Sequence, residues 1–331
     1  MLPTLEQIEA AAAVVYQSMP ATPQYQWPLL NQRLGVDLWL KHENHTPVGA
    51  FKVRGGLVYF DAHHSHLADT AGVICATRGN HGQSVAFAAS QHNIPVTIVV
   101  PEGNSSEKNA AMKALGAKLV VRGEDFQASL DIAAEIAQHE DFAIVPSFDA
   151  LLVAGVATYS LELFRAVTNI DVFYVPIGLG SGICGVLAAR NALGLQTEVV
   201  GVVSDQAQAY VKSFEAKRAI ESPASTRVAD GMACRRPQES ALSIICDQVS
   251  RITQVSDDEV EQAMRDIYFT THNVAEGAGA AAVAAVTKDA SKLKGKRVAA
   301  VLCGGNVDAS VFASVLGAGH GTQEKHDAAI K

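Results

Sequence analysis

The sequence lacks the long apolar segments that cross a membrane. Its longest candidates, such as residues 277–286, are short and rich in Ala and Gly, well below the roughly 18 apolar residues of a membrane span. Basic residues are also in the minority, because 26 Lys and Arg face 34 Asp and Glu and give a formal net charge of −8. We therefore expect neither an integral membrane protein nor a nucleic-acid binder.

Cysteine pairs at metal-ligand spacing are missing as well. The five cysteines are scattered with no C-x-x-C motif, which favours reduced thiols over disulfides or a zinc site. The start of the chain has no basic region before an apolar one, and Thr4 and Gln7 are instead spaced as a helix capping box. This pattern predicts an N-terminal helix and a cytoplasmic protein.

The composition, 48% hydrophobic and 18% charged, is that of a globular protein with a large core. Short β-rich runs alternate with Ala-rich helical stretches, which predicts an α/β fold with parallel sheets covered by helices. Strands are expected at residues 73–76, 95–100, 118–121, 171–176, 198–203 and 297–303. The polar block at residues 217–237 is interpreted as a surface excursion.

A lysine between a loop and a helix start is the first candidate for chemistry. Lys52 follows Gly49, Ala50 and Phe51, and a partly desolvated amine at such a place can form a Schiff base. A structural or solvated lysine is the alternative interpretation.

The loop at residues 77–82 follows an expected strand and precedes an expected helix. Its backbone N–H groups are free to receive an anion such as a substrate carboxylate, and Asn80 can donate to a cofactor oxygen. A plain turn remains the alternative for this loop, and a structural histidine remains the alternative for His81.

Two further segments end apolar strands. Residues 176–182 place three glycines and a serine at a helix start, where a phosphate can bind. They do not contain the G-K-[ST] motif of a P-loop, and no acidic residue ends the next expected strand as in a dinucleotide site. Cys303 ends the last expected strand, where its side chain faces either a ligand crevice or the core.

Together and in this order, the four segments resemble the pyridoxal-phosphate enzymes of the tryptophan-synthase-β fold type (fold type II), and among them the serine/threonine dehydratase and serine racemase family. The resemblance covers about residues 22–311. It implies a two-lobed α/β fold with pyridoxal 5'-phosphate in the cleft, a large domain of residues 1–68 and 149–331, and a small domain of residues 69–148. It also implies a homodimer.

By this resemblance Lys52 is the Schiff-base lysine and the catalytic residue, Phe51 lies beside the cofactor ring, Asn80 bonds the ring hydroxyl and Cys303 faces the pyridine nitrogen. The phosphate would be held by Gly178, Leu179, Gly180, Ser181 and Gly182. The substrate would be bound by Thr77, Arg78, Gly79, His81 and Phe148, while Glu276 would support the site from behind.

A neutral thiol at the pyridine nitrogen makes a weaker electron sink than a carboxylate would, which favours prompt loss of a β-leaving group. The resemblance therefore implies a lyase that takes a small-molecule substrate, a 3-hydroxy amino acid, to a 2-oxo acid and ammonia, with Lys52 removing the Cα proton. Racemisation, β-replacement and a non-catalytic cofactor-binding protein remain alternatives.

The sequence also departs from the family pattern. Arg78 replaces a serine or alanine, which disfavours a two-base racemase and suits either a second carboxylate, as in 3-hydroxyaspartate, or a surface ion pair. Phe148 suits either a bulky substrate such as 3-phenylserine or core packing.

Two acidic positions that bind a divalent cation in the family correspond here to Val203 and to Gln208 or Ala209, so no metal site is predicted, although Asp205 lies nearby. The chain ends soon after Asn306, so we expect no regulatory domain and a catabolic role.

Overall fold

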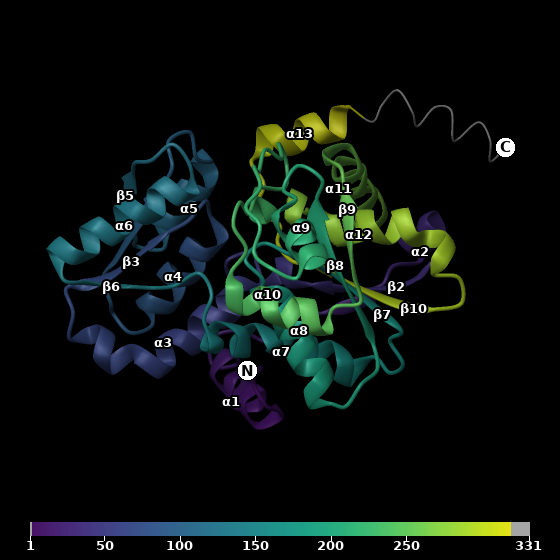
Figure 1. Cartoon of the computed structure of the whole chain (residues 1–331), viewed down its shortest axis with the longest axis horizontal. Helices are drawn as coiled ribbons and strands as arrows, with labels where there is room; N and C mark the ends of the chain where they lie inside the picture. The colour runs from purple at the N-terminus through teal and green to yellow at the C-terminus, as the bar shows by residue number, and fades with distance from the viewer. Residues whose placement is uncertain (1, 319–331) are drawn as a thin grey trace.

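The computed structural model describes residues 2–318, which form two separate sheets (Figure 1). The larger sheet has six strands in the order β1-β2-β10-β7-β8-β9, and every neighbouring pair is parallel except β1 with β2. Its strands are β1 (Gln24–Gln26), β2 (Asp37–His42), β7 (Val172–Pro176), β8 (Glu198–Ser204), β9 (Arg251–Val255) and β10 (Arg297–Leu302).

The smaller sheet has four parallel strands in the order β5-β4-β3-β6. Its strands are β3 (Gly72–Ala76), β4 (Val96–Val100), β5 (Lys118–Val121) and β6 (Phe142–Ile144). The two central strands, β3 and β4, are buried along their whole length, as expected of a parallel sheet with helices on both faces. We call this sheet with its helices the small lobe and the rest of the described chain the large lobe.

Helices cover both sheets (Figure 1). The small lobe carries α4 (Asn80–Ser90), α5 (Ser106–Ala114) and α6 (Phe126–Glu140). Another helix, α3 (Lys52–Ala68), packs against α4 and also against α7 (Ala150–Ala166) of the large lobe. The remaining elements are α1 (Leu5–Val15), α2 (Pro28–Leu34), η1 (Glu43–His45), α8 (Ser181–Ala192), α9 (Ala209–Ala216), η2 (Asp230–Met232), α10 (Glu239–Gln248), α11 (Asp257–Thr271), α12 (Gly277–Asp289), η3 (Ala290–Lys292) and α13 (Ala309–Gly317).

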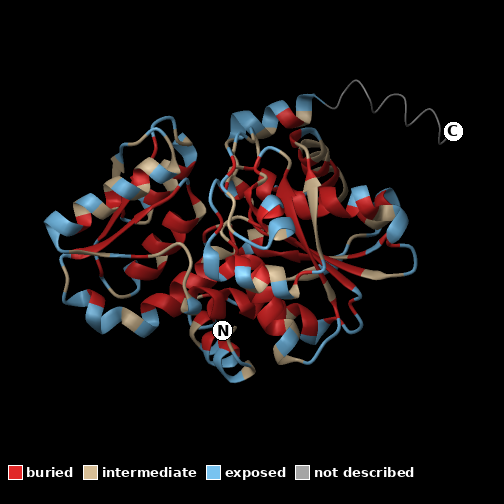
Figure 2. Cartoon of the chain, viewed as in Figure 1, coloured by how far each residue is buried: buried red, intermediate tan, exposed pale blue. Residues whose placement is uncertain are grey.

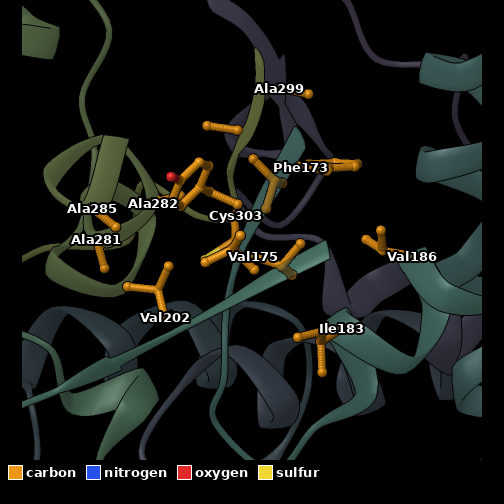
Figure 3. Close-up of a cluster of buried hydrophobic side chains, with 14 of the residues drawn as sticks. Phe173, Val175, Ile183, Val186, Val202, Ala281, Ala282, Ala285, Ala299 and Cys303 are labelled. Carbon is orange, nitrogen blue, oxygen red and sulfur yellow. The ribbon is translucent and has the colours of Figure 1, made fainter. Parts of the chain in front are cut away.

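The core of the large lobe depends on small side chains. The Ala- and Gly-rich helix α12 is buried from Gly277 to Val286, and its alanines lie beside Val202 and Cys303 (Figure 3). Figure 2 shows the buried residues concentrated in the two sheets and in the helices between the lobes. Small residues on α12 let the helix backbone approach the sheet closely, and this brings the segment after β10 next to the start of α12.

Most of the expected elements are confirmed, including the capping box of Thr4 and Gln7 on α1. All five cysteines are free, as predicted. No helix within residues 2–318 is long and apolar enough to cross a membrane. The smaller sheet lies inside residues 69–148, but the predicted domain boundaries themselves stay predictions.

The interpretation of residues 217–237 as a surface excursion is wrong for their middle part. Ala229, Met232 and Cys234 are buried, and Asp230 contacts a lysine of the small lobe. A polar composition usually indicates a solvated segment, whereas part of this block turns inward and packs between the lobes.

Candidate active site

Lys52 begins α3 directly after a turn that is joined to the end of β10. The amide of Phe51 donates to the carbonyl of Cys303 at 3.0 Å, and the amide of Gly305 donates to the carbonyl of Gly49 at 2.9 Å. Gly49 has a φ of 69°, and a Cβ there would lie 2.6 Å from the amide oxygen of Asn306. Only glycine readily adopts this positive φ and leaves room for the Asn306 side chain. The turn that Gly49 makes possible therefore holds Lys52 beside Cys303.

The Lys52 amine has an environment that favours its neutral form. Burial lowers its pKa, while the nearby Cys303 and Glu276 oppose the shift. Within the described part of the chain, no hydrogen bond or ion pair reaches its Nζ, which lies 4.9 Å from the centre of the Phe51 ring. A neutral, unpaired amine is the form that attacks a carbonyl carbon.

Cys303 is 7% exposed and follows the last residue of β10. Burial, with a further contribution from Glu276, raises the pKa of its thiol, so the side chain stays uncharged at neutral pH. The side chain packs in the core of the large lobe (Figure 3), yet it is also close enough to Lys52 for the two groups to interact electrostatically.

The glycine loop joins β7 to α8 and lies over the Phe51 ring. A Cβ on Gly182 would be 3.6 Å from the tip of that ring, and a Cβ on Gly178 would be 2.5 Å from the carbonyl oxygen of Gly231. Gly180, with a φ of 102°, caps α8 without any side-chain hydrogen bond. The uncapped first turn of α8 is a place where backbone N–H groups can bind a phosphate.

The loop at residues 77–81 leads from β3 into α4. Thr77 is buried and its hydroxyl accepts the amide N–H of Gly79 at 2.9 Å. Gly79 caps α4 without a side-chain hydrogen bond, so this helix start is also open to an anion. Arg78 is exposed, and the surface ion pair offered as one interpretation is not found among the described residues.

His81 lies behind this loop. It is 8% exposed, and its Nε2 has no hydrogen-bond partner in the described chain. Burial is the main cause that lowers its pKa to about 3, which makes it a neutral imidazole at physiological pH. The next turn of α4 reaches α3 directly, because the Ser84 hydroxyl donates to the Lys52 carbonyl at 2.7 Å.

Asn80 is held from two sides. Its Nδ2 donates to Glu276 Oε1 at 2.6 Å, and its Oδ1 accepts from Asn306 Nδ2 at 2.9 Å. One N–H of the amide is left for another acceptor. Glu276 therefore contacts Asn80 directly, while its role in supporting the site stays a prediction.

Two charged residues of this cluster were not predicted. Lys108 of α5 contacts Asp230 at 2.8 Å and Glu276 at 3.5 Å across the two lobes. Lys108 resembles any solvated lysine on a helix, and Asp230 belongs to the polar block whose composition indicates surface. No local signal in the sequence distinguishes either residue.

A second buried cluster surrounds Arg54, two residues after Lys52. Its guanidinium, fully buried, bonds Glu43 at 2.7 Å and Glu162 at 2.6 Å. Lys41 also pairs with Glu162, at 2.5 Å. Carboxylates from η1 and α7 thus fix the first turn of α3 and, with it, the backbone that carries Lys52.

Phe148 is half-buried and packs against the core of the large lobe, which fits the packing interpretation offered for it.

Among the residues that the structure describes, no group of three His, Cys, Asp or Glu is arranged to hold a metal ion. The carboxylate of Asp205 accepts a hydrogen bond from the side chain of Gln206 at 3.1 Å. The absence of a metal requirement stays a prediction.

The arrangement fits pyridoxal phosphate: an unpaired amine at Lys52, a neutral thiol beside it, a half-free amide at Asn80 and an uncapped glycine-lined helix start lie around one place. Two more observations come from comparison with known proteins. A family model described as pyridoxal-phosphate dependent enzyme matches residues 15–304. Curated relatives and solved structures match over most of the chain.

L-threonine ammonia-lyase of Thermotoga maritima is 31% identical over 317 residues, which are 96% of this chain and 79% of the relative. The catabolic L-threonine dehydratase TdcB of Staphylococcus aureus is 32% identical, with 95% and 92% covered. The crystal structure of T.th. threonine deaminase is 32% identical with a TM-score of 0.85 and covers 92% of this chain and 99% of that one. Maize serine racemase, at 24% identity and a TM-score of 0.88 over 99% and 100% of the two chains, shares the fold.

Proposed function

Because this chain belongs to the family of pyridoxal-phosphate dependent enzymes, we propose that it is a lyase that removes the β-hydroxyl of a 3-hydroxy amino acid and yields a 2-oxo acid and ammonia. The water lost with the hydroxyl group is taken up again when the nitrogen is released, so the reaction balances without any other reactant. The names of the relatives, L-threonine ammonia-lyase and L-threonine dehydratase, support this reaction.

The observation that carries the proposal is the buried, uncharged thiol of Cys303 beside the turn that carries Lys52, where the amide of Phe51 donates to the Cys303 carbonyl at 3.0 Å. When bound, pyridoxal phosphate supplies an electron sink for the bond electrons released at Cα. A thiol that keeps its proton does not stabilise positive charge on the ring nitrogen as a carboxylate does. The weak sink favours immediate loss of a β-leaving group over reactions that need a long-lived carbanion.

Lys52 would hold the cofactor and then act as the base. Burial lowers its pKa, which favours the unprotonated form of Nζ that can accept the Cα proton. No second base is apparent at position 78, because an arginine stays protonated. This supports elimination over two-base racemisation.

Each of the two uncapped helix starts, those of α4 and α8, would bind one anionic group. The glycine loop with α8 would bind the cofactor phosphate, and the loop of Thr77, Arg78, Gly79 and His81 with α4 would bind the substrate carboxylate. Asn80 would donate its remaining N–H to the ring hydroxyl. Phe51, in contact distance of Gly182, would exclude water from the ring.

The substrate side chain is the open part of this proposal. Arg78 is exposed with no partner in the described chain, and its guanidinium fork suits a second carboxylate. Phe148 is packed against the core, which leaves less support for a role in binding an aromatic substituent. We therefore rank 3-hydroxyaspartate above 3-phenylserine as a test substrate beside threonine and serine.

The test is release of 2-oxo acid by the cofactor-loaded protein from L- and D-serine, L-threonine, 3-hydroxyaspartate and 3-phenylserine, with stereoisomers separated. Activity on one of them, lost in Lys52→Ala, supports the lyase. If only 3-hydroxyaspartate turnover falls in Arg78→Gln, Arg78 binds the second carboxylate. A silent panel contradicts the proposal. D-amino acid formed from L-serine would then indicate a racemase, and thioether formed from O-acetylserine would indicate β-replacement.

A homodimer and a cytoplasmic location belong to the same proposal. Sedimentation of the loaded protein tests the first, with a species of twice the 34.9 kDa chain expected.

A further inference from the structure

One buried cation joins the two lobes at the candidate site. Lys108 lies on α5 of the small lobe, whereas Asp230 on η2 and Glu276 at the start of α12 belong to the large lobe. The Lys108 side chain is 9% exposed and its Nζ lies 2.8 Å from Asp230 and 3.5 Å from Glu276. These are the contacts of an ion pair that forms only when the lobes lie against each other.

The alkyl part of Lys108 also touches the loop before α4. A Cβ on Gly79 would lie 2.6 Å from Lys108 Cδ, so the lysine chain passes directly beneath the expected carboxylate-binding loop. Other contacts join the lobes nearby, such as Ser105 with Asp308 and Arg235 with Asp125. The pair of Arg235 and Asp125 is exposed, with side chains 58% and 37% accessible, whereas Lys108 is enclosed.

Glu276 is the partner with consequences for the site. It is 2% exposed and accepts the Asn80 amide at 2.6 Å. Its charge is also felt by Lys52 and by Cys303. A change in the protonation of Glu276 therefore reaches the amine, the thiol and the amide that surround the cofactor.

The charges around Glu276 oppose one another. Burial raises the pKa of its carboxyl and Asp230 raises it further, while Lys108 and the Asn80 hydrogen bond lower it. The charge of Glu276 also affects the pKa of Lys52 and that of Cys303. Lys108 itself keeps its proton, because the two carboxylates outweigh the effect of burial on its pKa.

We propose that Lys108 is a positioning residue that, from the small lobe, sets the protonation of Glu276 in the large lobe, and through it the hold on Asn80. The inference rests on the placement of the cofactor proposed above and not on the reaction. The positive charge that faces Glu276 thus comes from Lys108 of the small lobe.

The test is an infrared pH titration of Glu276 in the cofactor-loaded protein, with the carboxyl band identified by its loss in Glu276→Gln. In Lys108→Met, which keeps the alkyl chain over Gly79, the titration midpoint should rise by about 1–3 pH units, because a cation is removed from a buried carboxylate. Lys108→Arg should stay near the wild-type midpoint. Asp230→Asn should lower the midpoint, since it removes the competing anion.

Lys113→Met is the matched control, because Lys113 is exposed on the same helix and should leave the midpoint unchanged. A midpoint in Lys108→Met equal to that of the wild type would overturn the inference. If Lys108→Met does not fold, Lys108→Gln, which also removes the charge, takes its place. The infrared readout does not need turnover, so failure of the lyase proposal and failure of this inference are separate outcomes.

Discussion

The buried cluster around Arg54 predicts a large and specific loss of stability. The guanidinium makes six hydrogen bonds, to Glu43, Glu162, Thr22 and Thr158, and is fully buried. Arg54→Met keeps much of the side-chain volume but leaves the buried Glu43 without a cation and Glu162 with Lys41 alone. Removing one partner of such a buried pair costs about 3–5 kcal/mol.

Calorimetry gives the measurement. With an unfolding entropy of about 2.1 cal/mol/K per residue, a chain of 331 residues loses about 4–7 °C in Tm for that free energy. Arg165→Met is the matched control, because Arg165 also pairs with a glutamate, Glu9, but both side chains are about half exposed. Its cost should stay below about 1 kcal/mol.

Two results would refute the reasoning on Arg54. One is a Tm loss in Arg54→Met no larger than in Arg165→Met. The other is a failure of Glu43→Gln, added to Arg54→Met, to recover any of the lost stability, since a neutral side chain at position 43 removes the unpaired buried charge that the single variant creates.

Three further predictions concern pH, packing and metal. Burial lowers the pKa of His42 to about 4 and that of His81 to about 3, so between pH 6.5 and about pH 4 it is mainly the unfolded chain that takes up these protons. As the pH is lowered through this range, the free energy of unfolding measured with denaturant should fall by up to about 1.4 kcal/mol per pH unit for each imidazole. His42→Asn should make this dependence on pH less steep, and an unchanged dependence would contradict the prediction. In the same assay, Gly277→Ala should lower the free energy of unfolding by about 1–3 kcal/mol, because its Cβ would lie 2.0 Å from the Val228 carbonyl oxygen. Gly317→Ala is the control and should not destabilise the protein, because a Cβ there has open space around it. Equal effects of the two substitutions would contradict the packing argument. EDTA should change 2-oxo acid release less than twofold, and a severalfold loss restored by magnesium would show that a cation site exists.

Six parallel strands, β3, β4, β5, β7, β8 and β10, were predictable because each is a local apolar run with a helix after it, whereas β2, β6 and β9 were not predicted. Residues 118–121, for example, are the bounds that β5 has in the structure. The strand β1 escaped prediction for the opposite reason: its three residues, Gln24–Gln26, are polar and mostly exposed, and only antiparallel pairing with β2 makes them a strand. Such pairing is a tertiary contact that no local pattern encodes.

The same distinction applies to the site. Lys52, Asn80 and the glycine loop were predicted because each stands in a short motif between a strand and a helix. The bond from Asn80 to Glu276 joins residues 196 positions apart, and the partners of Lys108 lie on the other lobe. Charged residues on helices usually face water, so the burial of Lys108 against Asp230 between the lobes becomes visible only in the folded chain.

The central claim is that Lys52 carries the cofactor. Treating the pyridoxal-phosphate-loaded protein with borohydride fixes the cofactor on the amine that holds it, and mass spectrometry of the digested protein then identifies that lysine. The account predicts the modification on the peptide that contains Lys52 and its loss, together with the visible absorbance of the bound cofactor, in Lys52→Ala. Modification of another lysine, or unchanged absorbance in Lys52→Ala, would contradict it.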